Sequence, residues 1–339
     1  MTMNTQKHIA QKSATLGDIA SRAGVSRMAV SVVLNGSRSG TRVSHATRQK
    51  ILDIARELNY RPNSLARSLA RRATHIFGFY SGFNYFDARN PFIAELTAGL
   101  LEECARYKRD LLLHTVFRGQ DINGLYDEML SGKIDGLVVW SPDDDPLVAR
   151  LRDSHLPVVS VVETLPPFPS VGVDEYMGSY EIGQYLFDHG HRSILYLTLN
   201  APSKSRLRRL EGIQEAAAQM GMKLQMIVDP TWEGWPETLA LSYPPRLRPT
   251  AIACWNDMAA YQSLSYCRRV GIAVPQEIAI TGFDGIESPI EQDMRLTTVR
   301  APWAQVASTA VTYLVDLLEG REVPTETILP VELIYGSTA

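Results

Sequence analysis

From residue 74 to the end of the chain, short apolar segments alternate with longer amphipathic ones, and this alternation constrains the fold most. The apolar segments have the length of strands: IFGFY (76–80), DLLLHTV (110–116), GLVVW (136–140), PVVSVV (157–162), SILYLT (193–198), TAIAC (250–254) and EIAITGF (277–283). Between them lie helical patterns such as PFIAELTAGLLEECARYK (91–108) and YMGSYEIGQYLFDHG (176–190). Buried strands that alternate with helices predict parallel sheets covered on both faces, and this stretch is long enough for two such lobes.

Open parallel sheets bind ligands at the carboxyl ends of their strands, so a cleft between the two lobes is the expected pocket. The sequence has no GxSxG elbow, no P-loop and no HExxH motif. The HGH motif at 189–191 lacks a third metal ligand at a useful spacing and favours a loop before a strand. The DDD motif at 143–145 favours a solvated loop over a cation site. We therefore predict a binding protein that is not an enzyme and needs no cofactor.

The bulk properties are those of a globular protein inside the cell. The chain has 339 residues, enough for two or three domains, and 45% of them are hydrophobic without an apolar run of bilayer length. The amino-terminal segment MTMNTQKHIAQKSATL is polar and carries no secretory signal. Cys104, Cys254 and Cys267 are isolated, which indicates buried thiols in a reduced compartment. These features predict a cytoplasmic protein with no membrane contact.

A net charge of −3 hides a strong asymmetry between the two ends of the chain. Residues 1–75 contain 13 Lys+Arg and 3 Asp+Glu, whereas the remainder contains 21 basic and 34 acidic residues. The basic residues of this head are interleaved with periodic apolar ones, unlike those of a solvated tail. A folded basic module on an acidic body indicates that the head meets a polyanion.

The head carries the pattern of a helix-turn-helix. Thr15 and Asp18 have the spacing of a capping box, and Gly24 ends the first helix because glycine tolerates a left-handed turn. Ser26 is placed to cap a second helix, and Ser44 a third. Two short helices joined by a glycine-containing turn are typical of DNA-binding helix-turn-helix proteins.

The segments TLGDIASRAGVSRMAVSVVLNGS (15–37) and VSHATRQKILDIARELNYRPNSLARSL (43–69) resemble the LacI/GalR family of bacterial transcription regulators. The resemblance implies an all-α headpiece whose second helix enters the major groove, and a hinge helix in the minor groove. The hinge segment, NSLARSLARR (63–72), is too short to be stable alone and needs a partner surface. We predict a headpiece over 1–60, ordered from about residue 14, a hinge helix over 61–73, and an effector-binding and dimerisation domain over 74–339.

Residue by residue, the resemblance assigns base reading to Arg27 and Met28, and minor-groove contacts to Ala66 and Leu69, with Leu69 as a wedge. Other positions match residues that hold phosphates or orient the head. The predicted DNA-binding residues are Ser26, Arg27, Met28, Ser31, Val32, Asn35, Arg38, Arg42, Tyr60, Asn63, Ala66, Arg67 and Leu69.

Two departures from the family pattern affect how this head reads DNA. Position 32, usually arginine, is Val32, which offers only apolar contact, for example to a thymine methyl. The loop NGSRSGTRVS (35–44) is longer than usual and carries Arg38 and Arg42. We hypothesise that base reading shifts toward Arg27 and that the loop arginines contact phosphates. Val32 as a core residue and the arginines as solvated charges remain the alternatives.

The body resembles the family's effector domain, which is similar to periplasmic sugar-binding proteins. The matching stretches run in order to the end of the chain and include NPFIAEL, IDGLVVW, SVGVDEYMGSY, RRLEGIQEA, AIACWNDMAAYQ and GIAVPQEIAITGFDGIE. The resemblance implies three crossings between the lobes. One lobe is expected over about 74–174 and 302–324, and the other over 175–301 and 325–339.

The effector residues that the resemblance implies suit a sugar or a sugar acid. Arg209 would fork onto ligand oxygens, Asn256 would donate and accept, and Asp284 would accept from hydroxyls. Phe92 would stack under the ligand, and Trp232 or Trp235 would cover it.

Several of these assignments have a structural alternative. Asp284 could also cap the segment after its strand, and Trp232 could be rim packing. The ring-rich loop over 80–92 could shape the pocket or cover a lobe edge, while Asp174 favours bracing a crossover.

Taken together, these features predict a homodimeric, ligand-responsive repressor on a pseudo-palindromic operator. The effector would bias the orientation of the lobes and, through it, the pairing of the hinge helices. The alternative is a soluble sugar carrier without a DNA role, but a carrier needs an export signal and no basic helical head.

Overall fold

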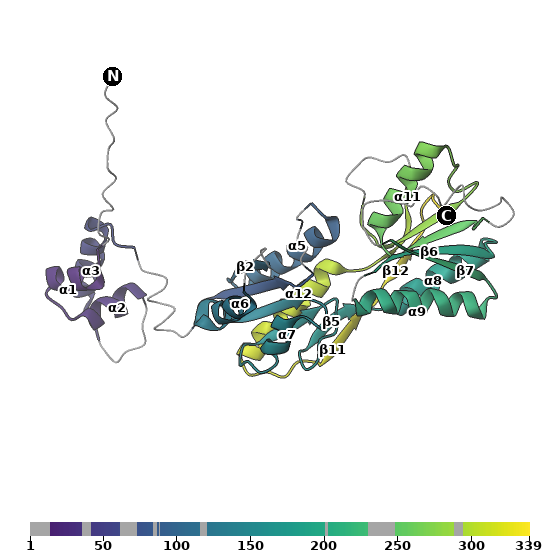
Figure 1. The fold of residues 1–339 in the computed structure, drawn as a ribbon. Helices are drawn as coiled ribbons and strands as arrows, with labels where there is room; N and C mark the ends of the chain where they lie inside the picture. Colours follow the sequence, from purple (N-terminus) through teal and green to yellow (C-terminus); the bar gives the residue numbers. More distant parts are fainter. Residues whose placement is uncertain are drawn as a thin grey trace, which may run out of the picture. The chain divides into compact units, whose positions relative to one another are not determined.

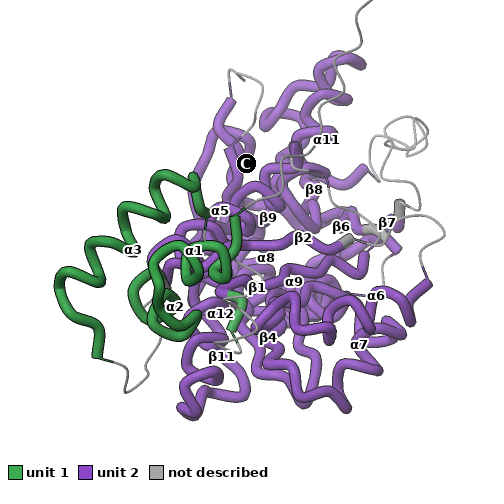
Figure 2. Tube along the Cα trace, turned by 90° about the vertical axis from the view of Figure 1, so that its left-hand side faces the viewer, with its two compact units in different colours: residues 1–74 green, residues 75–339 purple. Residues whose placement is uncertain are grey.

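The structure is a computed structural model that describes residues 14–35, 42–61, 73–83, 87, 89–115, 121–200, 203–229, 248–287 and 294–339 (Figure 1). The chain divides into two compact units, residues 1–74 and residues 75–339 (Figure 2). Each unit has its own hydrophobic core.

Within residues 14–35 and 42–61, the first unit forms three short helices, α1 (Leu16–Ala23), α2 (Arg27–Asn35) and α3 (His45–Glu57). The predicted capping box is confirmed, since Thr15 and Asp18 each accept a hydrogen bond from the other's backbone N–H. Gly24 ends α1 with a φ of 72°. Ser26 accepts from the Ala29 amide at 3.2 Å and Ser44 from the Thr47 amide at 3.2 Å, so both predicted caps are confirmed.

The core of this unit is small and is built from one face of each helix. Ile19, Val30 and Ile51 are fully buried at its centre. The predicted all-α head is therefore confirmed. The predicted hinge helix over 61–73 lies outside the described residues, apart from Arg61 and Ala73.

The described residues of the second unit form two six-stranded sheets, one in each lobe. The first sheet is parallel throughout, in the order β11 (Glu326–Leu329), β5 (Ser170–Val173), β4 (Val158–Val161), β3 (Gly136–Trp140), β1 (Ile76–Ser81) and β2 (Asp110–Thr115). The second sheet has the order β12 (Glu332–Ile334), β10 (Thr297–Arg300), β9 (Ala279–Asp284), β8 (Ala251–Cys254), β6 (Ser193–Leu199) and β7 (Lys223–Asp229). Only β12 is antiparallel to its neighbour in this sheet.

Helices cover both faces of each sheet, as the alternating pattern predicts (Figure 1). In the first lobe, α5 (Pro91–Arg106) and α12 (Trp303–Leu318) lie on one face. The helices α6 (Ile122–Glu128) and α7 (Pro146–Leu151) and the π-helix η1 (Met129–Lys133) lie on the other. In the second lobe, α8 (Glu175–Asp188) and α9 (Lys204–Gln219) cover one face and α11 (Asp257–Val270) the other.

The chain crosses between the lobes after β5, after β10 and after β11. The last crossing corrects one expectation. We expected residues 325–339 in the second lobe, but β11 pairs in parallel with β5 at the edge of the first sheet. The chain then crosses at about Pro330, and β12 joins the second sheet beside β10. Pairing with β5 satisfies the backbone groups of that strand's open edge, which explains why the crossing comes late.

Candidate functional site

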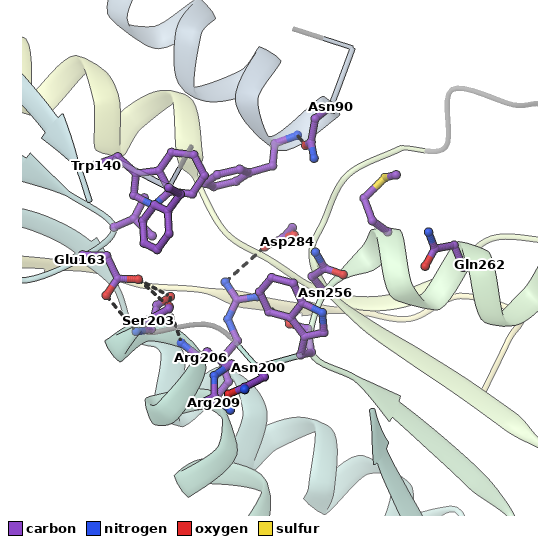
Figure 3. A pocket seen from close by; sticks show the side chains of 16 residues that line it. Asn90, Trp140, Glu163, Asn200, Ser203, Arg206, Arg209, Asn256, Gln262 and Asp284 are labelled. Carbon is purple, nitrogen blue, oxygen red and sulfur yellow. Dashed lines mark hydrogen bonds and ion pairs between the residues drawn. The ribbon is translucent and has the colours of Figure 1, made fainter. Parts of the chain in front are cut away.

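A cavity of about 560 Å³ lies between the two lobes, within the range of about 300–1,000 Å³ that is typical of small-ligand pockets (Figure 3). Its walls come from the carboxyl ends of strands and from the first turns of helices. The lining residues are Phe83, Asn90, Phe92, Trp140, Val162, Glu163, Asn200, Ser203, Ser205, Arg206, Arg209, Trp255, Asn256, Met258, Gln262 and Asp284.

The structure brings together four of the six predicted effector residues in this pocket: Phe92, Arg209, Asn256 and Asp284. The other two, Trp232 and Trp235, lie outside the described residues. Each of the four follows from local structure, because α5 and α9 begin at the cleft and β8 and β9 end there.

The side of the pocket formed by the first lobe is mainly aromatic. Asn90 caps α5 by accepting from the Phe92 amide at 3.0 Å, which fixes Phe92 in the first turn. The Phe92 ring packs edge-on against Trp140 and Trp303, with centroids 5.2 Å and 5.0 Å away. The ring of Phe83 lies 4.8 Å from that of Trp140. Aromatic rings in this arrangement offer flat apolar surfaces to a ligand.

The described residues of the ring-rich loop over 80–92 belong partly to the pocket wall and partly to the core of the first lobe. Phe83, Asn90 and Phe92 line the pocket. Tyr80 instead belongs to the core, where its hydroxyl donates to Asp145 at 2.9 Å, and burial raises its pKa far above the ordinary value. Tyr85 and Phe86 lie outside the described residues.

The floor of the pocket on the second lobe is an ion cluster around Arg209, whose side chain is almost fully buried. Its Nε and Nη2 donate to the two carboxylate oxygens of Glu175, and Nη2 also reaches Asp284 Oδ1 at 3.3 Å. Nη1 donates to the carbonyl of Trp255 at 2.7 Å. The guanidinium carbon stacks 3.8 Å from the ring centroid of Phe283. These contacts occupy most of the five N–H donors of the guanidinium.

Burial dominates the titration of this cluster. It raises the pKa of Glu175 to about 7, although the neighbouring Arg209 opposes the shift. Burial likewise raises the pKa of Asp284 to about 7, again against Arg209. Burial lowers the pKa of Arg209, but Glu175 and then Asp284 outweigh it, so its pKa lies above the ordinary value. The guanidinium therefore stays charged while the carboxyl groups titrate near neutral pH.

Asn256 and Asp284 line the pocket, and the local backbone constrains both of them. Asn256 Oδ1 caps α11 by accepting from the Ala259 amide at 2.9 Å, so its amide NH₂ is the group that can serve a ligand. Asp284 ends β9 with a φ of 126°, a conformation that L-residues rarely adopt. Such strain persists only where the surroundings impose it, and it gathers at ligand sites.

Sequence reasoning missed several lining residues, above all Glu163 and Trp140. Trp140 was visible only as the last residue of the strand GLVVW, whose carboxyl end faces the cleft. Glu163 follows β4 and has only 3% of its surface exposed. Its position after a buried strand was the one available signal, since a glutamate in a loop ordinarily indicates a solvated residue.

In the head, the predicted base-reading residues lie on the solvent side of α2. Arg27 is exposed, and Met28 exposes 55% of its surface. Val32 is half-buried and stands apart from the described core of the head, which Val30 and Val33 join. Val32 is thus not a member of that core, and its groove-facing role stays a prediction.

The structure describes some of the remaining predicted DNA-binding residues. Ser26 caps α2, Ser31 is half-buried on it, Arg42 is exposed, and Tyr60 packs against the core of the head. The backbone of Asn35 ends α2. Arg38, Asn63, Ala66, Arg67 and Leu69 lie outside the described residues.

The weaker sequence motifs turn out to have structural roles. In the HGH motif, a ring nitrogen of His189 contacts the Tyr185 carbonyl and one of His191 contacts Thr250. In the DDD motif, Asp145 is buried and caps α7. Within the described ranges, no three His, Cys, Asp or Glu side chains are grouped to hold a metal ion.

Cys104, Cys254 and Cys267 are free and buried. Among the helices of the described part, none combines the length and apolar character needed to cross a membrane.

A helix-turn-helix unit joined in one chain to a two-lobed unit with a ligand-sized cleft defines the class of ligand-responsive DNA-binding regulators. Comparison with known proteins is consistent with this. Residues 15–63 match the family model "Bacterial regulatory proteins, lacI family", and residues 184–339 match "Periplasmic binding protein-like domain".

Similar proteins and structures extend along almost the whole chain. The "HTH-type transcriptional repressor PurR" of Photobacterium profundum is 30% identical over 318 residues, covering 91% of this chain and 93% of that protein. The "Catabolite control protein A" of Priestia megaterium is 29% identical, covering 91% and 94%. A lac repressor dimer bound to operator and the anti-inducer ONPF shares the fold with a TM-score of 0.81 at 23% identity, covering 96% of this chain and 99% of that one. The chain therefore belongs to the LacI family of bacterial regulators; it is a DNA-binding transcriptional repressor and not an enzyme.

Proposed function

We propose that this repressor acts as a homodimer on a pseudo-palindromic operator, and that a sugar or sugar acid in the interlobe pocket controls its affinity. The observation that carries the proposal is the pocket itself, which joins aromatic rings of one lobe to a buried polar floor of the other. Such a site suits a ligand with a flat apolar face and several hydroxyl groups.

Charge favours a neutral sugar over a sugar acid. The N–H donors of Arg209 are already directed at Glu175, Asp284 and the Trp255 carbonyl. Few of them are therefore left to bind a ligand carboxylate. Glu163 on the first lobe and Asp284 on the second add buried acidic oxygen atoms to the lining of the pocket. A carboxylate or phosphate would face these oxygens, whereas a ligand hydroxyl group could donate to Asp284.

A purine is the second candidate for the effector. It is favoured by the names of several relatives, such as the PurR of Photobacterium profundum, and by the rings of Phe92 and Trp140, which could stack on a base. A sugar is favoured by the CelR regulator, solved as a cellobiose complex and similar in fold with a TM-score of 0.69 at 24% identity. The two candidates differ in the number of hydroxyl groups that Asp284 could bind.

A ligand panel tests the effector class. Thermal unfolding of the full chain is measured with neutral sugars, uronic acids and purine bases, and the hits are repeated on Asp284→Asn and on the surface control Asp188→Asn. A neutral sugar should raise the melting temperature of the parent and of the control but raise it much less for Asp284→Asn, since that variant loses a charged acceptor. A hit from purines alone would overturn the sugar assignment.

DNA binding is tested separately, by titrating random-sequence duplex DNA against the full chain at increasing salt. The affinity should fall steeply as salt rises, because phosphate contacts release counterions. The basic head makes this expectation specific to a DNA-binding protein. No detectable binding at low salt would refute the proposed use of the head.

A further inference from the structure

We propose that Glu163 is a latch that holds the two lobes together before any effector enters the pocket. The inference concerns the regulation of the effector site and so rests on the proposed function. It starts from a contact between the lobes that no catalytic or ligand-binding role explains. Glu163 belongs to the first lobe, where it follows β4, and its carboxylate meets the first turn of α9 in the second lobe (Figure 3).

The carboxylate makes a full set of contacts across the cleft. Oε1 accepts from the hydroxyl of Ser203 at 2.6 Å and from that of Ser205 at 3.1 Å. Oε2 accepts from the backbone N–H of Lys204 at 2.7 Å and from that of Ser205 at 3.4 Å. A carboxylate that caps a helix usually comes from the same chain segment; here Glu163 and its partners are about 40 residues apart.

Because this contact is buried, it should contribute to the free energy of lobe closure. Glu163, Ser203 and Ser205 expose only 3%, 8% and 8% of their surfaces. A charged hydrogen bond in such a place is stronger than one in water, and the N-terminus of a 16-residue helix adds a favourable dipole. If the lobes separated, the carboxylate and the amides of the first turn of α9 would need water in place of each other.

The backbone before Glu163 is strained in a way that serves the same contact. Val162 has a φ of 67°, in the left-handed region that a β-branched residue rarely enters. The Glu163 amide then donates to the Val161 carbonyl at 2.7 Å, which completes a sharp turn at the end of the strand. The turn brings the Glu163 side chain to face α9. Strain of this kind persists where other contacts impose it.

A second contact beside the latch is exposed and supplies a matched control. Lys204 Nζ lies 3.1 Å from Asp143 Oδ2 and donates to the Thr164 carbonyl at 2.9 Å, so it also joins the two lobes. Both charged side chains are 46% exposed, and exposed ion pairs contribute little to stability. The latch should therefore depend on Glu163 and very little on Asp143.

The consequence is a ligand-free protein whose closed arrangement is already populated. A ligand can shift a two-state equilibrium only by its differential affinity for the two states. With the latch in place, most molecules are already closed, so an effector that binds the closed cleft spends little binding free energy on closing it. Without the latch, fewer molecules are closed, and the apparent affinity for the effector falls in proportion to the closed fraction.

The experiment measures the distance between the lobes in the full chain, without DNA or effector. Spin labels are placed on α5 at Ala98→Cys and on α11 at Ser265→Cys, both exposed positions, in a background whose buried native cysteines are replaced. Labelled chains are diluted with unlabelled ones so that pulsed dipolar spectroscopy reports distances within one chain. The variants compared are Glu163→Ala, Glu163→Gln, Ser205→Ala and the control Asp143→Asn.

Glu163→Ala should move the distance distribution to longer values and broaden it, and Asp143→Asn should leave it unchanged. Glu163→Gln should give an intermediate shift, because it keeps one acceptor and loses the charge. Ser205→Ala tests the latch from the opposite lobe if the first variant folds poorly. An unchanged distribution in well-folded Glu163→Ala or Ser205→Ala overturns the latch, whatever ligand the pocket takes. Absence of any ligand hit leaves this result untouched and counts only against the proposed effector class.

Discussion

Replacing Arg209 with methionine tests whether the floor of the pocket depends on a buried cation. Methionine is unbranched and of similar length, so it removes the charge while keeping most of the packing. Arg209 exposes 3% of its surface and serves Glu175, Asp284 and the Trp255 carbonyl. Removing one partner of a buried ion pair costs about 3–5 kcal/mol, because the other charge is left uncompensated. We expect a loss of that size in the free energy of unfolding at alkaline pH.

The loss should depend on pH with a definite sign. In the parent protein the folded-state pKa values of Glu175 and Asp284 are raised to about 7, above their unfolded values of 4.5 and 3.8. Their contribution to stability is therefore complete at low pH and declines as pH rises toward 7. Without Arg209 both values rise further. At acid pH the carboxyl groups are largely protonated in both proteins. At alkaline pH the parent ionises them beside Arg209, whereas the variant must ionise them with no cation in contact.

The stability difference between the two proteins should thus grow above pH 7, by up to about 1.4 kcal/mol per pH unit for each carboxyl group. Urea unfolding followed by tryptophan fluorescence at about pH 6 and about pH 9 measures it. A Glu175→Gln, Arg209→Met pair completes a double-mutant cycle, which should recover part of the loss at the higher pH. A loss of equal size at both pH values, together with a coupling energy near zero, would show that the cluster is only packing.

Three more outcomes can be measured on the same protein. Gly285→Ala should destabilise the effector unit by more than Gly271→Ala in urea unfolding: both glycines have φ in the seventies, but a Cβ at Gly285 would lie 2.5 Å from the backbone of residue 300, whereas Gly271 has open space. Equal losses would refute the steric argument. Thr15→Ala should lower the stability of the head by about 1 kcal/mol, read from faster hydrogen exchange in α1, because the capping box is lost. Val32→Arg should enrich guanine at one half-site position when binding sites are selected from random DNA, whereas the parent should not; identical enriched sites would contradict the groove-facing role of residue 32.

The sequence predicts the parallel lobes well because buried strands are continuous apolar runs. All seven runs became strands, and each ends within a few residues of its predicted limit. The strands at the sheet edges gave weaker signals. In β11 the side chains alternate between exposed and half-buried, so ETIL does not stand out as a strand. The assignment of residues 325–339 to one lobe failed for this reason, since the sheet that β11 joins is decided by the open edge of β5.

The sequence predicts pocket residues that belong to recognisable family motifs, but not residues whose surroundings depend on how the two lobes meet. Arg209, Asn256 and Asp284 were assigned from family motifs and lie together. Glu163 has its partners on α9, about 40 residues away, and only the closing of the cleft makes it a buried residue. The sequence also did not reveal that most N–H donors of Arg209 are already used, because their partner Glu175 lies at the start of another helix, α8.

The helix α9 links the two features of the cleft that the sequence did not reveal. Ser205 and Arg209 are four residues apart, so they lie on the same face of α9, and both are buried. The first receives the carboxylate of the opposite lobe, and the second forms the floor on which a ligand would rest. A helix moves as a rigid element, so a change in the lobe angle that shifts Ser205 from Glu163 also shifts Arg209 relative to Phe92 and Trp140. Loss of the latch should therefore weaken binding of any ligand that touches both walls of the pocket, and it should do so without altering the ion cluster beneath.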